Sequence, residues 1–183
     1  MKDISDQEKS YIAGFLDGDG CINAQIVRRP DYQLRFQIRV SITFFQKSNR
    51  HWFLLWLKKK LVYGAIRKRP DGISEYAIVG NQIVKIILEN LQGHLQLKRK
   101  QAKLVLDIIN NLSKLQNPPT FIKLCGLVDK MVFLNDSKKR TITALVVRNE
   151  LEKHNLFPVE TEGIKTRDIF SGEKKYKTPT PAD

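Results

Sequence analysis

Two carboxylates stand two positions apart in the stretch YIAGFLDGDGCI, which covers residues 11–22. Residues 11–16 suit a packed helix, whereas Asp and Gly are poor helix formers and Gly commonly follows a helix end. A helix that ends here places Asp17 and Asp19 at its C-terminus, where the helix dipole disfavours an anion. A divalent cation offsets this repulsion, because Mg²⁺ typically binds one or two carboxylates together with phosphate oxygens and water. The pair therefore indicates metal-assisted chemistry on a phosphate, although Asp-Gly-Asp-Gly is also typical of an ordinary helix cap and turn.

The composition indicates which molecule would carry that phosphate. Lys and Arg number 32 and Asp and Glu number 19, which gives a net charge of +13. This excess favours a nucleic-acid partner over a basic protein that is charged only for solubility. The two cysteines, Cys21 and Cys125, are too few for a disulfide framework or a zinc site. We therefore expect a nucleic-acid-binding protein in a reducing compartment.

Membrane and export signals are not found in the sequence. No apolar run approaches the roughly 20 residues that span a bilayer. Residues 1–10 are polar and partly acidic, unlike a secretory signal or an Arg-rich transit peptide. We expect no membrane partner and an intracellular protein that is made where it works.

The periodicity of the first hundred residues predicts an α+β core. Ser5 and Glu8 have the spacing of a capping box, which predicts a helix from about Asp6 to Asp17. Alternating apolar and polar residues predict two hairpinned strands, over 22–26 and 34–44. Further patterns predict a helix over 52–61, strands over 65–69 and 73–79, and a helix over 82–91. The order αββαββα gives one four-stranded antiparallel sheet.

Three more amphipathic helices are predicted after this core, over 98–115, 121–134 and 141–154. From residue 158 onward apolar residues become sparse, and Lys, Thr, Pro and Glu dominate. We therefore divide the chain into a folded domain, 1–157, and a flexible polar tail, 158–183.

One face of the predicted sheet is rich in Arg, Asn and Gln and almost free of acids. A solvated antiparallel sheet also has a polar face, but Arg suits guanine and Asn or Gln suits adenine in the DNA major groove. We assign this face to base reading, with Val27 placed to touch a thymine methyl group. The base-reading residues are Asn23, Gln25, Val27, Arg29, Tyr32, Arg35, Gln37, Arg39, Ser41, Thr43, Arg67, Arg69 and Glu75.

Small residues on the first helix suggest close packing against another helix. Gly14 and Gly18 lie four positions apart on one helical face, which lets two backbones approach. We expect a dimer interface made of Ile12, Ala13, Gly14, Leu16, Asp17 and Gly18.

The stretch IAGFLDGDG, residues 12–20, resembles the signature helix of the LAGLIDADG homing endonucleases. It is most similar to the single-motif group that is encoded in group I introns of algal organelles. The stretches FFQKSNRHWFL, RKRPDGISEY, LQLKRKQAKLVL and LNDSKKR resemble later blocks of that group in the same order. The resemblance covers roughly residues 5–155 and implies the LAGLIDADG fold, with the sheet as its DNA-binding surface.

The resemblance also implies roles for individual residues. Asp19, the last acid of the motif, would bind the metal together with the carbonyl of Gly18. Gln46, Arg50 and Lys98 match the residues that organise water and phosphate near the metal. Without the resemblance, Gln46 would be interpreted as a strand-end cap and Lys98 as a solvated helix start. The expected phosphate contacts are Lys47, Lys100, Ser137, Lys138, Lys139 and Arg140.

The implied activity is cleavage of a long pseudo-palindromic double-stranded DNA site by a homodimer. One phosphodiester is hydrolysed per strand across the minor groove, which leaves 3′ overhangs. Mg²⁺ is the expected cofactor, Mn²⁺ should substitute for it, and Ca²⁺ should bind without supporting cleavage. The expected location is a chloroplast or mitochondrion whose genome encodes the protein.

Two other functions use the same fold. An RNA-binding intron maturase and a DNA-binding regulator that does not cleave would both tolerate loss of Asp19 and Lys98. Both residues are present, so we expect DNA rather than RNA as the partner.

Overall fold

The computed structural model describes residues 4–112, 117–135 and 140–156. The predicted tail over 158–183 and three of the expected phosphate contacts, Ser137, Lys138 and Lys139, lie outside the described residues.

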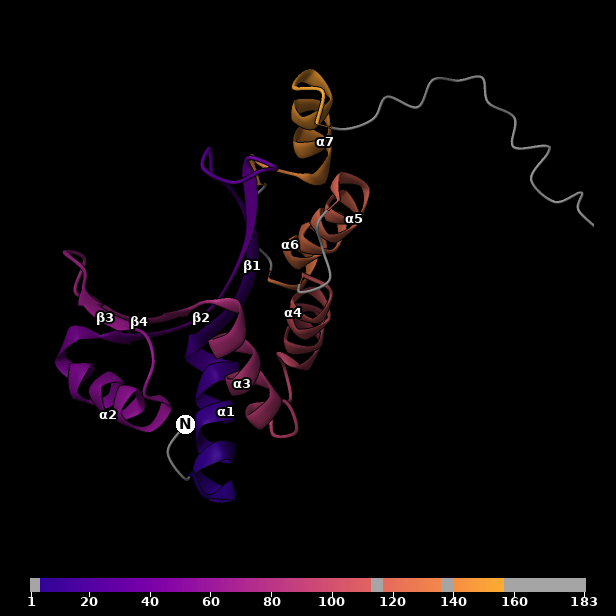
Figure 1. The fold of residues 1–183 in the computed structure, drawn as a ribbon. Coiled ribbons are helices and arrows are strands. Elements are labelled where there is room, and N and C mark those ends of the chain that lie inside the picture. The colour runs from indigo at the N-terminus through magenta and orange to yellow at the C-terminus, as the bar shows by residue number, and fades with distance from the viewer. Residues whose placement is uncertain (1–3, 113–116, 136–139, 157–183) are drawn as a thin grey trace, which may run out of the picture.

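The predicted α+β order is confirmed in the structure (Figure 1). The core consists of α1 (Asp6–Asp19), β1 (Gly20–Arg28), β2 (Phe36–Lys47), α2 (His51–Leu61), β3 (Ala65–Lys68), β4 (Ile73–Val79) and α3 (Asn81–Leu91). A short 3₁₀ helix, η1 (Ser48–Arg50), precedes α2. The C-terminal helices are α4 (Arg99–Leu112), α5 (Pro118–Asp129), α6 (Met131–Leu134) and α7 (Ala144–Lys153).

Local capping explains where several helices begin. The predicted capping box is present in α1, where Ser5 Oγ accepts from the Glu8 N–H at 3.3 Å and Glu8 Oε2 accepts from the Ser5 N–H at 3.2 Å. The Asn117 side chain accepts from the Thr120 N–H at 3.0 Å, so α5 begins at Pro118, three residues earlier than predicted. Thr143 caps α7 in the same way, and this helix therefore begins at Ala144 rather than at Thr141.

The four strands form one antiparallel sheet in the order β1-β2-β4-β3. β1 is an edge strand, and polar side chains from the segment between α6 and α7 occupy its outer carbonyls. Asn135 Nδ2 donates to the Ile22 carbonyl at 2.9 Å, and Arg140 Nη1 donates to the Ala24 carbonyl at 2.5 Å. These contacts cover an edge that would otherwise be open to pairing with another strand.

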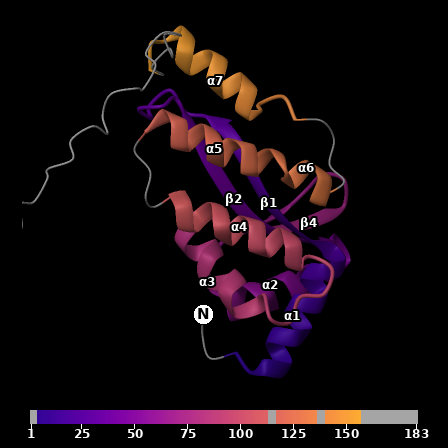
Figure 2. The same cartoon turned by 90° about the vertical axis from the view of Figure 1, so that its right-hand side faces the viewer.

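The helices cover one face of the sheet (Figures 1 and 2). Apart from Arg28, the even-numbered side chains of β1 and β2 from Ile22 to Phe44 are buried against α1, α3, α4 and α5. Figure 2 shows α4 and α5 lying across β1 and β2. Odd-numbered side chains point to the opposite, concave face, over which Figure 1 shows no helix of the described chain. No helix within the described ranges is long and apolar enough to cross a membrane.

Candidate active centre and nucleic-acid interface

The end of α1 places Asp19 directly beside the first residue of the sheet. Gly20 begins β1, and a Cβ atom at this position would lie 2.8 Å from the Leu16 carbonyl oxygen, so the abrupt change from helix to strand needs glycine here. The Asp19 carboxylate is exposed, and Gln46 Nε2 donates to Asp19 Oδ2 at 3.0 Å. The structure therefore brings together two of the predicted site residues from α1 and the end of β2.

Asp17 has a different role from the one that the sequence suggested. It lies within α1 and is buried, and its carboxylate accepts backbone N–H groups of Gln96, Leu97 and Lys98 at 2.7, 3.2 and 2.9 Å. These amides lie just before α4, where the helix dipole favours an anion. The expectation that a metal offsets the charges of both acids is therefore wrong for Asp17, because peptide N–H groups already satisfy it.

Lys98 is tied to the same helix end. Its Nζ donates to the backbone carbonyl of Asp17, in the last turn of α1. Carbonyls in the last turn lack intrahelical partners, and a cation is favourable there. Lys98 is partly exposed and contacts Asp17, which lies two residues before Asp19 in the motif. Arg50, at the end of η1, is exposed, and within the described part of the chain no hydrogen bond or ion pair joins it to Asp19.

The residues at Asp19 supply only some of the ligands that a metal ion needs. The described residues contain no cluster of three or more His, Cys, Asp or Glu side chains that could hold a metal ion. One exposed carboxylate remains, next to the Gly18 carbonyl in the last turn of α1. Mg²⁺ accepts such a set when phosphate oxygens and water supply the remaining ligands. These residues therefore fit a divalent cation that is shared with a bound phosphodiester.

A hollow of about 390 Å³ adjoins this helix end. Its lining includes Asp17, Cys21, Lys98 and Gln101. The Gln101 Nε2 donates to the Leu134 carbonyl at 2.7 Å, whereas its buried Oε1 has no hydrogen-bond partner among the described residues. Sequence reasoning missed Gln101, because a glutamine inside an amphipathic helix gives no signal that it is buried.

Most of the predicted base-reading residues of β1 and β2 do share the concave face. The strand register sets three pairs side by side: Asn23 with Ser41, Gln25 with Arg39, and Val27 with Gln37. Thr43 and Phe45 lie on the same face, so the polar surface has an apolar neighbour near Glu75, which pairs with Phe45. Arg67 Nη2 contacts Glu75 Oε2 at 2.8 Å across β3 and β4.

The residues at the tip between β1 and β2 depart from the strand pattern. Arg35 has a φ of +56°, which ends the alternation, and its Nη1 lies 3.2 Å from His154 Nε2. Arg29 lies just beyond β1 and binds Asp31 at 2.7 Å, while its guanidinium stacks over the Tyr32 ring. Arg69 also lies outside its strand, where it pairs with Asp71 at 2.6 Å. Arg29 Nη1 also donates to Gln37 Oε1 at 3.1 Å, so Arg29 adjoins the concave face, whereas Arg35 and Arg69 have their contacts away from it.

Arg140 is placed differently from the expected surface phosphate contact. Its guanidinium bonds the Ala24 carbonyl at 2.5 Å and Asn23 Oδ1 at 2.8 Å, and burial lowers its pKa. A basic residue in a loop suggests a solvated side chain, but this one is half-buried and covers the edge of β1, and its contact with a phosphate stays a prediction. Lys47 and Lys100 are exposed, as a phosphate contact requires.

The predicted interface on α1 is only partly on the surface. Ile12, Ala13 and Leu16 are 0% exposed, and they pack into the core of their own chain. Gly14 and Gly18 are exposed, with nothing within 4 Å of a Cβ atom at either position. The helical period explains the correction, because residues 12, 13, 16 and 17 face the sheet while 14 and 18 face outward.

The comparisons with known proteins identify the class. The profile of the LAGLIDADG endonuclease family matches residues 12–109, and the chain belongs to this family. Among its relatives is DNA endonuclease I-CvuI of Chlorella vulgaris, which is 51% identical over 79% of this chain and 89% of its own length. DNA endonuclease I-CreI of Chlamydomonas reinhardtii is 40% identical over 78% of this chain and 87% of its own length.

Solved structures of I-CvuI agree with the fold described above. A complex with its DNA target and Ca aligns with a TM-score of 0.79 at 47% identity, and covers 84% of this chain and 97% of the other. A second complex, with the I-CreI target in the presence of Mg and with the DNA not cleaved, aligns with a TM-score of 0.78 at 48% identity. It covers 81% of this chain and 95% of the other.

Proposed function

We propose that this protein is a site-specific DNA endonuclease that cleaves double-stranded DNA with a divalent metal bound at Asp19. The observation that carries the proposal is the direct junction of α1 and β1. Asp19 ends the helix and Gly20 begins the strand, so the metal-binding acid and the polar concave face belong to one continuous segment. A duplex held on that face lies with a backbone phosphate near Asp19.

The residues around Asp19 have separate tasks in this reaction. Gln46 donates to Asp19 Oδ2, and the other carboxylate oxygen would bind the cation. Lys98 presents positive charge at the same helix end, where it can balance charge on the phosphate. Mg²⁺, when bound, polarises the scissile phosphate and supplies hydroxide at neutral pH. We expect Mn²⁺ to replace Mg²⁺ and Ca²⁺ to bind without supporting cleavage.

The active protein is proposed to be a homodimer. Each chain offers one exposed motif carboxylate, and cutting both strands needs two. The bare outer face of α1 at Gly14 and Gly18 allows a second α1 to approach closely. A two-fold axis between these helices places one Asp19 on each strand and requires a pseudo-palindromic site. Cleavage across the minor groove would leave 3′ overhangs.

We place the gene in an organelle genome of an alga, in a chloroplast or a mitochondrion. The support is the likeness to endonucleases from Chlorella and Chlamydomonas, together with the resemblance of the motif to intron-encoded proteins. Detection of the coding sequence inside a group I intron of such a genome tests this proposal.

Selection from a randomised duplex library tests the function. The full chain is incubated with the library and Mg²⁺, and the cut ends are sequenced. We expect one pseudo-palindromic consensus with 3′ overhangs, and no cut ends with Asp19→Asn. Cleavage without sequence preference, or equal cleavage by Asp19→Asn, would overturn the proposal. Preferential binding of intron RNA with no DNA cleavage would instead favour the maturase.

A further inference from the structure

The outer half of the β1–β2 hairpin extends beyond the sheet as a two-stranded ribbon. β4 pairs with β2 only from Lys47 to Ser41, so residues 36–40 of β2 pair with residues 24–28 of β1 alone. Figure 1 shows this ribbon rising away from β3 and β4. Two strands without further support are only marginally stable in water. The direction of the tip therefore depends on what the ribbon contacts on its helix-facing side.

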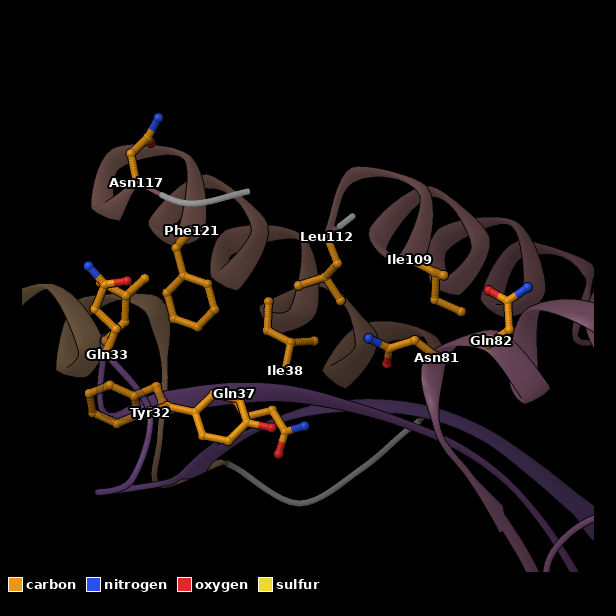
Figure 3. Close-up of a pocket in the computed structure, with 12 residues that line it drawn as sticks. Tyr32, Gln33, Gln37, Ile38, Asn81, Gln82, Ile109, Leu112, Asn117 and Phe121 are labelled. Atoms are coloured by element: carbon orange, nitrogen blue, oxygen red, sulfur yellow. The ribbon is translucent and has the colours of Figure 1, made fainter. Parts of the chain in front are cut away.

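That side is not packed continuously. A pocket of about 400 Å³ lies between the ribbon and the helices. Figure 3 shows Ile38 of β2 facing Ile109, Leu112 and Phe121 of α4 and α5 across it. The ribbon therefore packs on the helices through buried side chains such as Phe36 and Ile38, with a pocket beside them.

The next support is α7, which is itself fixed to α5. The Ala144 N–H donates to Asp129 Oδ2 at 2.9 Å, and Val147 and Leu151 are buried. α7 is thus held on α5, and its Glu150 side chain contacts the ribbon from there.

Two contacts join α7 to the end of the ribbon. Arg28, the last residue of β1, forms a two-pronged ion pair with Glu150, in which Nη2 lies 2.5 Å from Oε1. The guanidinium also lies over the Phe36 ring, 5.4 Å from its centre. Beyond this pair, Arg35 Nη1 lies 3.2 Å from His154 Nε2. A planar guanidinium held in this way fixes direction as well as distance.

Arg28 is not one of the residues that face the DNA-binding side. It has the same parity as the buried Ile26, so its side chain is on the helix-facing side of the ribbon. Its charge therefore acts on α7, while its neighbours Val27 and Arg29 have the opposite parity.

We propose that α7 is a specificity-determining element, in which Glu150 and His154 are positioning residues for the base-reading tip. The proposal rests on the endonuclease function proposed above. Gly20 and Arg28 are eight residues apart, which is roughly 26 Å along a strand. At 3.4 Å per base pair, the tip reads bases about eight pairs from the cut. A less firmly held tip should weaken discrimination at those outer base pairs. Discrimination at the central base pairs and cleavage at Asp19 should stay the same.

The simpler interpretation is that Arg28–Glu150 is an ordinary surface ion pair. Such pairs contribute little to stability, and the Arg28 side chain is 53% exposed. The two interpretations differ in what they change: an ordinary pair has no effect on base preference, whereas a positioning pair changes it at particular positions.

The test uses the full chain with the Glu150→Gln substitution, which removes the charge and keeps the size. Binding is measured against every single-base-pair variant of the selected site. We expect discrimination to fall by about twofold to fivefold per half-site at the outer pairs. Discrimination at the central pairs, and the cleavage rate on the unchanged site at saturation, should equal those of the wild type. Thermal unfolding verifies that the variant is folded.

Glu152→Gln is the matched control, because Glu152 also lies on α7 but pairs with Arg148 of the same helix at 3.3 Å. It should leave the profile unchanged. Arg28→Glu should reduce discrimination at the outer base pairs. Adding Glu150→Arg should restore it, because the double variant forms the same ion pair with the charges exchanged.

Three results would overturn the inference. They are an unchanged profile in Glu150→Gln, an equal change in Glu152→Gln, and a reversed pair that restores nothing. If the wild type itself selects no site, the endonuclease function fails and this inference fails with it, which separates the two causes.

Discussion

Asp17 and Lys98 form two hydrogen bonds, each between the side chain of one residue and the backbone of the other. The Asp17 carboxylate accepts the Lys98 backbone N–H at 2.9 Å, and the Lys98 side chain donates to the Asp17 backbone carbonyl. These bonds join the C-terminus of α1 to the start of α4 and hold the Lys98 side chain against the end of α1. The first acid of the motif is a structural anchor, and the second, Asp19, remains exposed for chemistry.

Asp17→Asn should destabilise the protein by about 1–3 kcal/mol. The amide lacks the negative charge that attracts the three N–H groups. Its own NH₂ group is a donor and cannot accept any of their hydrogen bonds. Urea unfolding measures the loss of stability. Because Lys98 is displaced with α4, cleavage should also slow. A variant as stable as the wild type would show that the anchor is not needed.

Asp19→Asn should lose cleavage and keep site-specific binding. The substitution removes a ligand charge for the cation without a change of size, and Asp19 is exposed, so the fold does not depend on it. Gel-shift titration in Ca²⁺ and a cleavage assay in Mg²⁺ measure the two properties. Cutting at the wild-type rate would rule out Asp19 as the metal-binding residue.

Gly18→Leu should weaken the dimer. A large side chain on the outer face of α1 forces two helices apart, and such overpacking typically costs about 1–3 kcal/mol. Sedimentation in the presence and absence of DNA measures the association. Gly126→Leu on α5 is a matched control, because no atom lies within 4 Å of a Cβ there either. An unchanged, active Gly18→Leu dimer contradicts the packing, and a monomer that cuts both strands contradicts the dimer.

Arg39→Ala and Lys100→Ala should have different effects on DNA binding. Arg39 is exposed in the middle of the concave face, beside Gln25, where it can reach a base edge. Its loss should relax preference at a symmetric pair of positions, by about 1–3 kcal/mol at each. Lys100, at the start of α4, should contribute equally to all sequences, and its loss should lower the salt slope by about one unit per contact. Titrations of site variants at several salt concentrations distinguish the two. A uniform loss with Arg39→Ala would make the face a non-specific platform.

The two thiols should differ in their reaction with iodoacetamide. Burial raises the pKa of the Cys125 thiol to about 12, and its side chain is inaccessible. Burial also raises the pKa of Cys21, but this residue is partly exposed and lines the hollow beside Lys98. Because the thiolate is the reactive form, we expect slow labelling of Cys21 near neutral pH and none of Cys125. Bound DNA should protect Cys21. Mass spectrometry of the labelled protein checks both statements, and rapid labelling of Cys125 would contradict its burial.

Local patterns were sufficient to predict most of the elements. The Ser5–Glu8 capping box and the two-residue alternation depend on neighbours within a few positions, so they can be read along the chain. The αββαββα order was confirmed for this reason. The end of α1 was placed two residues too early because Gly18 suggested a stop. The helix continues to Asp19 because contacts from distant residues hold its last turn.

The roles of individual side chains were decided by partners far along the chain. The N–H groups that bind Asp17 are about 80 positions away, and the carbonyl that binds Arg140 belongs to Ala24. Sequence periodicity does not indicate partners so far along the chain. A charged residue that is buried and hydrogen-bonded therefore cannot be told from a solvated one by sequence.

The sequence by itself determined which elements form and which faces are polar, because hydrogen bonding and side-chain periodicity within an element are local. Only the tertiary structure decided the strand order β1-β2-β4-β3, the burial of Asp17 beside the exposed Asp19, and the contact of α7 with the tip of the β1–β2 ribbon. These depend on packing between segments whose separation along the chain carries no information about their distance in space.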